Sequence, residues 1–89
     1  MEDWIVYILR CSDNSLYTGI TRDITRRINE HNSHTKLASA YTRSRRPVKL
    51  VYMETCKNRS EASKREAVIK NMKKSAKEKL ILMQENQYE

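Results

Sequence analysis

Residues 4–20, WIVYILRCSDNSLYTGI, decide the fold of this chain of 89 residues. They begin with an apolar run at 4–9 that has strand length and is rich in β-branched and aromatic side chains. Because the run is apolar at every position, both faces of this strand must be covered, which predicts a central strand. Turn-forming residues follow at 12–15, and residues 16–20 return as the second strand of a hairpin.

The single glycine of the chain, Gly19, interrupts that second strand. A glycine inside a strand weakens it and commonly marks a bulge or the close approach of another group to the backbone. Two phenols, a guanidinium and an imidazole lie close to it in sequence, on Tyr7, Tyr17, Arg27 and His31. The region is therefore either a surface hairpin followed by an amphipathic helix or part of an active site.

The remaining sequence predicts further elements in the order α-β-α-α. The predicted helices are one to about His34 with Asp23 as N-cap, one from Arg59 to Met72 with a capping box at Asn58 and Glu61, and one to about Gln87 signalled by Ser75 and Glu78. A basic connection at 36–47, with a short helical turn near 37–41, precedes a third strand at 48–53. The whole predicts one α+β domain, residues 1–89, with a three-stranded antiparallel sheet flanked by helices in the order β-β-α-β-α-α.

The charge balance favours a polyanionic partner such as nucleic acid. Lys and Arg number 18 against 11 acids, which gives a net charge of +7. The lysines near the C-terminus alternate with glutamates and predict a solvated helix face. Arginines cluster elsewhere, and the candidates for contacts with nucleic acid are Arg22, Arg26, Arg43, Arg45 and Arg46.

Several protein classes are excluded by the composition. No apolar run approaches the roughly 20 residues that span a bilayer, and no secretory leader pattern opens the chain. We therefore expect a cytoplasmic protein without a membrane partner. Cys11 and Cys56 lack the spacing of metal ligands and are expected to be free thiols, and His31 and His34 do not complete a zinc site with them.

Two helical stripes carry polar residues where apolar ones are expected. Arg27 and His31 share a stripe with Ile24 and Ile28, which predicts a polar pocket at the edge of the core. Glu66 shares a second stripe with residues 62 and 69. Burying an unpaired carboxylate is costly, so it should be compensated by an ion pair with Arg65 or Lys70, or by another cation.

The combination of Tyr7, the tripeptide Tyr17-Thr18-Gly19, Arg27, His31 and Glu66 resembles the GIY-YIG nuclease superfamily. More narrowly, the chain resembles the small stand-alone bacterial members of roughly this length, and the similarity extends from Trp4 to the last helix. The order and spacing of the residues carry the resemblance, because each residue alone is common in strands or helices.

The resemblance implies an endonuclease that hydrolyses DNA phosphodiester bonds with one divalent cation, Mg²⁺ or Mn²⁺. It implies Glu66 as the metal ligand, Gly19 as a structural residue and catalytic roles for Tyr7, Tyr17, Arg27, His31 and Glu66. Arg27 would donate hydrogen bonds to the phosphate oxygens. The general base is open among Tyr7, Tyr17 and His31, because a free phenol with a pKa of about 10 needs nearby positive charge to act.

The sequence departs from the family pattern in three respects. Ile5 stands where the first tripeptide is expected to have glycine, and Asn71 lies five residues after Glu66, a doubtful spacing for the asparagine that many members carry. No DNA-recognition domain is attached, so we expect DNA that is branched, nicked or otherwise not chosen by sequence, in repair or recombination. The alternatives are a non-catalytic nucleic-acid-binding module and a nuclease subunit that needs a partner protein.

Overall fold

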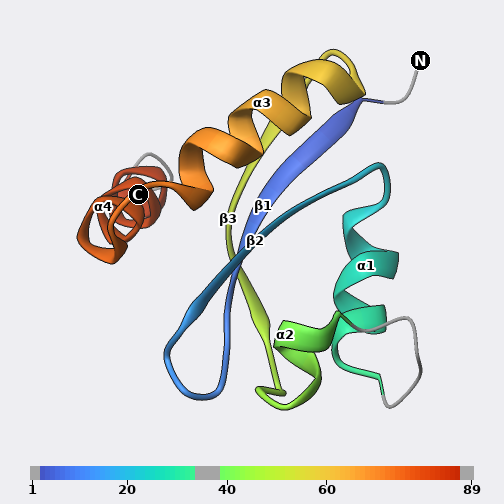
Figure 1. Cartoon of the computed structure of the whole chain (residues 1–89), viewed down its shortest axis with the longest axis vertical. Helices are drawn as coiled ribbons and strands as arrows, with labels where there is room; N and C mark the ends of the chain where they lie inside the picture. The colour runs from blue at the N-terminus through green and yellow to red at the C-terminus, as the bar shows by residue number, and fades with distance from the viewer. Residues whose placement is uncertain (1–2, 34–38, 87–89) are drawn as a thin grey trace.

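The computed structural model describes residues 3–33 and 39–86 (Figure 1). In chain order its elements are β1 (Trp4–Arg10), β2 (Leu16–Thr21), α1 (Ile24–His31), α2 (Ala40–Arg43), β3 (Lys49–Cys56), α3 (Arg59–Lys70) and α4 (Lys74–Asn86). The predicted α+β class, with a three-stranded antiparallel sheet and flanking helices, is confirmed.

The sheet has the order β2-β1-β3, so the apolar first strand is central, as predicted. Both pairings are antiparallel, and Tyr7 lies opposite Gly19 on β2 and opposite Met53 on β3. A shift of register between Ile8 and Leu9 leaves Val51 as an extra residue on β3. This bulge affects the half of β3 that is remote from α3.

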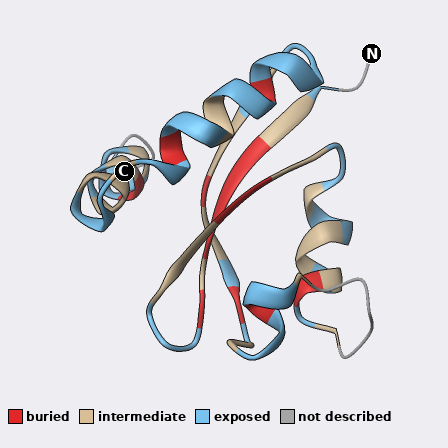
Figure 2. Ribbon diagram, in the orientation of Figure 1, coloured by how far each residue is buried: buried red, intermediate tan, exposed pale blue. Residues whose placement is uncertain are grey.

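Alternation along β1 divides the core between the two faces of the sheet. Val6 and Ile8 pack with the buried residues of α3 and α4, whereas Tyr7 and Leu9 pack with Val48 and with the apolar side chains of α1. Figure 1 shows α3 and α4 on one side of the sheet and α1 and α2 on the other. Figure 2 shows how the buried residues follow β1 through the centre. A strand covered on both faces is therefore apolar throughout.

Two of the three predicted N-caps are present, at the starts of α1 and α3. The side chain of Asp23 accepts from the Arg26 N–H, and that of Asn58 accepts from the Glu61 N–H. The third prediction is corrected, because α4 begins at Lys74: the amides of residues 76 and 77 bond to the Lys73 carbonyl, so Ser75 lies inside the helix.

The ends of the other helices differ from the predictions by a few residues. Helix α1 ends at His31 and α3 at Lys70, both earlier than predicted. The turn predicted near 37–41 corresponds to α2, which Ser39 caps by accepting from the Thr42 N–H. His34 and the first part of that predicted turn lie outside the described residues.

Helix α4 is attached to the sheet by polar contacts as well as by Ile81. Arg10 donates two hydrogen bonds to the Glu78 carboxylate, at 2.9 and 2.6 Å. Gln84 accepts from the Met53 N–H at 3.1 Å and donates to the Met53 carbonyl at 2.7 Å. The Gln84 amide thus satisfies the N–H and the carbonyl of Met53 on the outer edge of β3, which blocks pairing with another strand at this residue.

Both cysteines are free, as expected, with Cys11 buried and Cys56 half-buried. Among the residues described, no helix has the length and apolar character needed to cross a bilayer.

Thr18 allows a test of how a buried hydroxyl affects the stability of the core on the α3 side of β2. Its side chain is buried, and within the described residues its hydroxyl has no hydrogen-bond partner. A buried unsatisfied hydroxyl costs free energy that an apolar group of the same shape avoids. We expect Thr18→Val to raise the free energy of unfolding by about 1 kcal/mol, measured by urea titration.

Thr21→Val is the matched control, because the Thr21 hydroxyl accepts from the Asp23 N–H and donates to the Asp23 carbonyl. This variant should lose stability. A shift of both variants in the same direction would contradict the role given to the Thr18 hydroxyl.

Candidate active site

Gly19 is required because the phenol of Tyr7 occupies the place of its side chain. A Cβ atom at position 19 would lie 2.5 Å from the Tyr7 hydroxyl oxygen and 2.7 Å from Cζ, distances that real Cβ atoms essentially never show. The glycine has no positive φ, so its conformation does not demand glycine. The close approach that the sequence suggested is therefore made by a side chain of the neighbouring strand.

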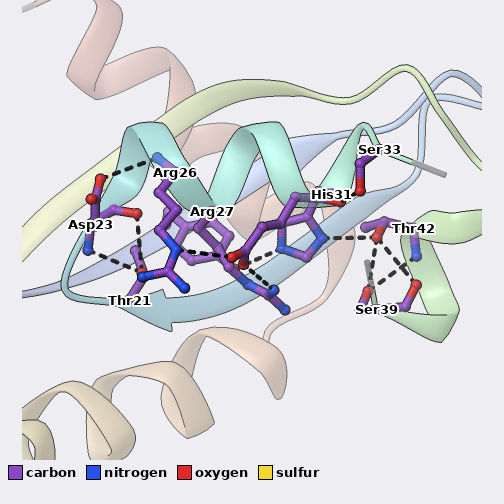
Figure 3. Close-up of polar contacts among 10 residues, drawn as sticks. Thr21, Asp23, Arg26, Arg27, His31, Ser33, Ser39 and Thr42 are labelled. Carbon is purple, nitrogen blue, oxygen red and sulfur yellow. Dashed lines mark hydrogen bonds and ion pairs between the residues drawn. The ribbon is translucent and has the colours of Figure 1, made fainter. Parts of the chain in front are cut away.

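The Tyr7 hydroxyl reaches across β2 to His31 at the end of α1. Its oxygen lies 2.9 Å from Nε2 of His31, and Nδ1 of His31 lies 2.8 Å from the Thr42 hydroxyl. Thr42 in turn contacts the hydroxyl and the carbonyl of Ser39, at 2.9 and 3.3 Å (Figure 3). A hydrogen-bonded chain thus runs from β1 through α1 to α2.

This chain indicates one tautomer of His31. The Thr42 hydroxyl is placed to donate to the Ser39 carbonyl, which leaves its oxygen to accept from the Nδ1–H of His31. Nε2 then accepts from the Tyr7 hydroxyl. The sequence analysis did not include Ser39 and Thr42. The N-cap pattern of Ser39 was readable, but its distance from His31 was not.

Burial keeps both members of the Tyr7–His31 pair neutral. Removal from water raises the pKa of Tyr7 to about 12, although a hydrogen bond with Arg27 acts in the opposite direction. Removal from water, reinforced by the charge of Arg27, lowers the pKa of His31 to about 4. At neutral pH, His31 is therefore a neutral imidazole that can accept a proton.

Arg27 lies beside the Tyr7 phenol and also donates to Glu30 at 2.8 Å. Its side chain is about one quarter exposed, at 26%. The hydrogen bonds from Arg27 and then Arg26 lower the pKa of the Glu30 carboxyl. Glu30, which the sequence analysis did not single out, thus holds the guanidinium in place.

Glu66 approaches from α3, in the opposite layer of helices. It lies on the stripe of the buried residues Ala62 and Ile69, but its side chain is 22% exposed. One of the predicted compensating ion pairs is present, to Lys70 at 3.4 Å, whereas Arg65 pairs with Glu54. The raised pKa of Tyr7 is due mainly to burial, and the charge of Glu66 makes the smallest contribution.

The described residues around Glu66 offer few protein ligands to a metal ion. Within the described ranges no three His, Cys, Asp or Glu side chains form a metal-binding group, which disfavours a closed zinc site. A single carboxylate suits Mg²⁺, which keeps several waters and shares its coordination with substrate phosphate. Asn71 instead caps the end of α3, where its N–H bonds to the Ala67 carbonyl.

The five candidate arginines do not form one cluster. Arg22 lies over the Trp4 ring at 5.9 Å, and Arg26 pairs with Glu30, near the start of α1. The other three follow α2 or end it. Arg46 donates to backbone carbonyls of residues 33 and 43, and Arg45 is paired with Asp13.

Comparisons with known proteins show which family and which relatives the chain is similar to. The sequence model of the GIY-YIG catalytic domain matches residues 3–80. The UPF0213 protein DP2720 of Desulfotalea psychrophila is 60% identical over 78 residues, covering 88% of this chain and 70% of its own length. A UPF0213 protein of Syntrophus aciditrophicus is 53% identical, covering 91% of this chain and 90% of its own.

Two solved structures share the fold of this chain. The solution NMR structure of the UPF0213 protein BH0048 from Bacillus halodurans is 38% identical with a TM-score of 0.58, covering 91% of this chain and 84% of its own. That of the protein EF2693 from E. faecalis is 33% identical with a TM-score of 0.61, covering all of this chain, at 100%, and 91% of its own.

The contact between Gly19 and Tyr7 can be tested by a double-mutant cycle. Gly19→Ala should lower the free energy of unfolding by about 1–3 kcal/mol, because the ring must move to admit the methyl group. In a Tyr7→Leu background, which lacks the phenol, the same substitution should have a much smaller effect. Equal effects in both backgrounds, measured by urea unfolding, would contradict the assignment.

The lowered pKa of His31 predicts how stability depends on pH. The unfolded chain, with a histidine pKa of about 6.5, binds this proton more readily than the folded protein, whose pKa is about 4. Stability must therefore fall as the pH decreases through this window, by up to about 3 kcal/mol. His31→Gln, which cannot take up the proton, should flatten the dependence measured by denaturant unfolding.

The carboxylates provide an internal control for this measurement. Hydrogen bonds lower the pKa of Glu30 and of Glu78 from 4.5, so their contributions are lost only below that value. The His31→Gln protein should therefore still lose stability below about pH 4.5, where these carboxylates take up protons. An unchanged slope between about pH 6.5 and 4.5 would show that His31 is not the group that titrates.

Proposed function

Because the chain belongs to the GIY-YIG catalytic-domain family, whose domain spans residues 3–80, we propose that it is a divalent-metal-dependent DNA endonuclease. The observation that carries this proposal is the buried hydrogen bond between Tyr7 and His31, beside the guanidinium of Arg27. These groups supply a proton acceptor and a phosphate ligand, and Glu66 adds a carboxylate whose charge acts on Tyr7.

In this proposal Tyr7 is the general base and His31 receives its proton. Attack of water on phosphorus releases a proton, and the Tyr7 oxygen accepts it while passing its own proton to Nε2 of His31. The phenol therefore need not ionise beforehand, which its pKa of about 12 would prevent at neutral pH. The negative phosphate that enters the site would favour the protonated form of His31.

Arg27 and Tyr17 would complete the positions around the phosphate. The planar guanidinium of Arg27 can donate two hydrogen bonds to the non-bridging oxygens, which gain negative charge in the transition state. Substrate would then compete with Glu30 for Arg27. The Tyr17 ring lies edge-on against His31 at 5.1 Å, so we assign it the role of positioning the imidazole and the phosphate.

Glu66 would hold the metal ion together with waters and a phosphate oxygen. When bound, a Mg²⁺ or Mn²⁺ ion supplies Lewis-acid stabilisation of the developing negative charge on phosphate and leaving oxygen. The ion pair between Glu66 and the half-exposed Lys70 is of the weak i,i+4 type. The carboxylate can therefore exchange this partner for a metal ion at little cost.

The substrate in this proposal is DNA selected by structure and not by sequence, as in repair or recombination in the cytoplasm. The arginines near the start of α1 and at the end of α2 would bind the phosphate backbone, and such contacts position DNA without reading its sequence. Arg22, Arg26 and Arg43 are exposed and are our candidates for these contacts.

Substitutions at the site provide the test of this function. Glu66→Gln and Arg27→Gln should each lower the rate of DNA cleavage at least about 100-fold, because they remove groups that act on the transition-state charge. Lys70→Gln, which removes only the ion-pair partner of Glu66, is the matched control and should retain cleavage. Cleavage of nicked, flapped, branched and single-stranded oligonucleotides is measured with Mg²⁺ or Mn²⁺ and with a chelator.

Three outcomes would contradict the nuclease: no metal-dependent cleavage by the wild-type protein, equal cleavage by Glu66→Gln and Lys70→Gln, or full activity of Arg27→Gln. DNA binding that weakens steeply with salt and ignores the metal would instead indicate a nucleic-acid-binding module.

A further inference from the structure

A row of side chains in contact leads from the candidate site to the surface, with edge-on and tilted ring contacts. The centroid of the Tyr17 ring lies 5.1 Å from that of the His31 ring and 5.8 Å from that of the Tyr41 ring of α2. The planes of the two tyrosine rings form an angle of 32°. The guanidinium of Arg45 lies 4.0 Å above the centre of the Tyr41 ring. We call Tyr17, Tyr41 and Arg45 the stacking row.

The outer end of the stacking row is held rigidly. Arg45 donates to the Tyr41 carbonyl at 2.8 Å and to the Asp13 carboxylate at 3.1 Å. The backbone of the same segment is fixed to the β1–β2 turn, because the Ser12 N–H donates to the Arg45 carbonyl at 2.9 Å. These contacts leave the guanidinium plane little freedom to rotate and partly neutralise its charge.

Despite these contacts, the outer end of the row remains open to solvent. Tyr41 is 38% exposed, and the Arg45 side chain is 35% exposed. Arg45 already donates through Nε to Asp13 and through Nη1 to the Tyr41 carbonyl, and its guanidinium, held over an aromatic ring, forms a flat platform. Unstacked nucleobases bind to such aromatic and guanidinium planes.

From this geometry we propose that the stacking row binds an unpaired nucleobase adjacent to the phosphate held at Tyr7 and Arg27. The proposal rests on the nuclease function and narrows its substrate to DNA with a single-stranded or splayed nucleotide beside the cut. A base inside a continuous duplex cannot reach the platform, because its two faces are covered by its neighbours. Arg45, which the sequence suggested as a phosphate contact, would thus contact a base.

Binding can be measured without cleavage in the Glu66→Gln protein, by the anisotropy of a labelled single-stranded oligonucleotide and of the matching duplex. Tyr41→Leu keeps an apolar side chain but removes the aromatic face, and Arg45→Lys keeps the charge but removes the plane. Each should weaken single-strand binding about tenfold and leave duplex binding unchanged, given the usual contribution of one stacked base. Tyr41→Phe should bind like the parent.

Three further measurements separate the effect of stacking from the effects of charge and of folding. Arg26→Gln, which removes a cation outside the stacking row, should weaken single-strand and duplex binding by the same factor. A 2-aminopurine in the single strand should lose fluorescence on binding to the parent protein and not to Tyr41→Leu. Thermal unfolding confirms that each variant is folded.

The inference is overturned if Tyr41→Leu and Arg45→Lys bind both DNAs like the parent, or weaken both by the same factor. Since cleavage plays no part in these measurements, an inactive nuclease leaves this result unaffected. Conversely, an active nuclease without preference for the single strand overturns the stacking row alone.

Discussion

One steric relation governs the rest of the site: the phenol of Tyr7 lies where the side chain of residue 19 would be. Only with that space empty can a tyrosine on the central strand cross β2 and meet His31. The crossing also explains why Tyr7 is almost fully buried, at 1% exposure, while its hydroxyl points toward polar groups. The perturbed acidities of Tyr7 and His31 then follow from their shared burial.

The sequence was sufficient for much of this architecture because local signals agree with the tertiary contacts. The unbroken apolar run of β1 requires cover on both faces, and Asp23 and Asn58 cap the helices that were expected to follow them. Membership of the family is now shown by residues 3–80.

The features that the sequence could not provide depend on contacts between distant segments. Nothing near His31 indicates that Thr42, eleven positions away, orients the imidazole. Likewise, Glu30 resembles the other acids on polar helix faces in the sequence. Its hydrogen bond with Arg27 can be identified only from the positions of both side chains. The start of α4 was predicted too late because a serine three residues before a glutamate also occurs inside helices.

The bidentate contact of Gln84 with the Met53 backbone has a consequence for synthesis on the ribosome. Gln84 follows Met53 by 31 residues, so the outward N–H and carbonyl of Met53 stay unpaired until α4 has emerged and docked. During that interval this position on the edge of the nascent sheet can pair with a neighbouring chain. Docking of the last helix therefore closes one position on the sheet edge that is open during synthesis.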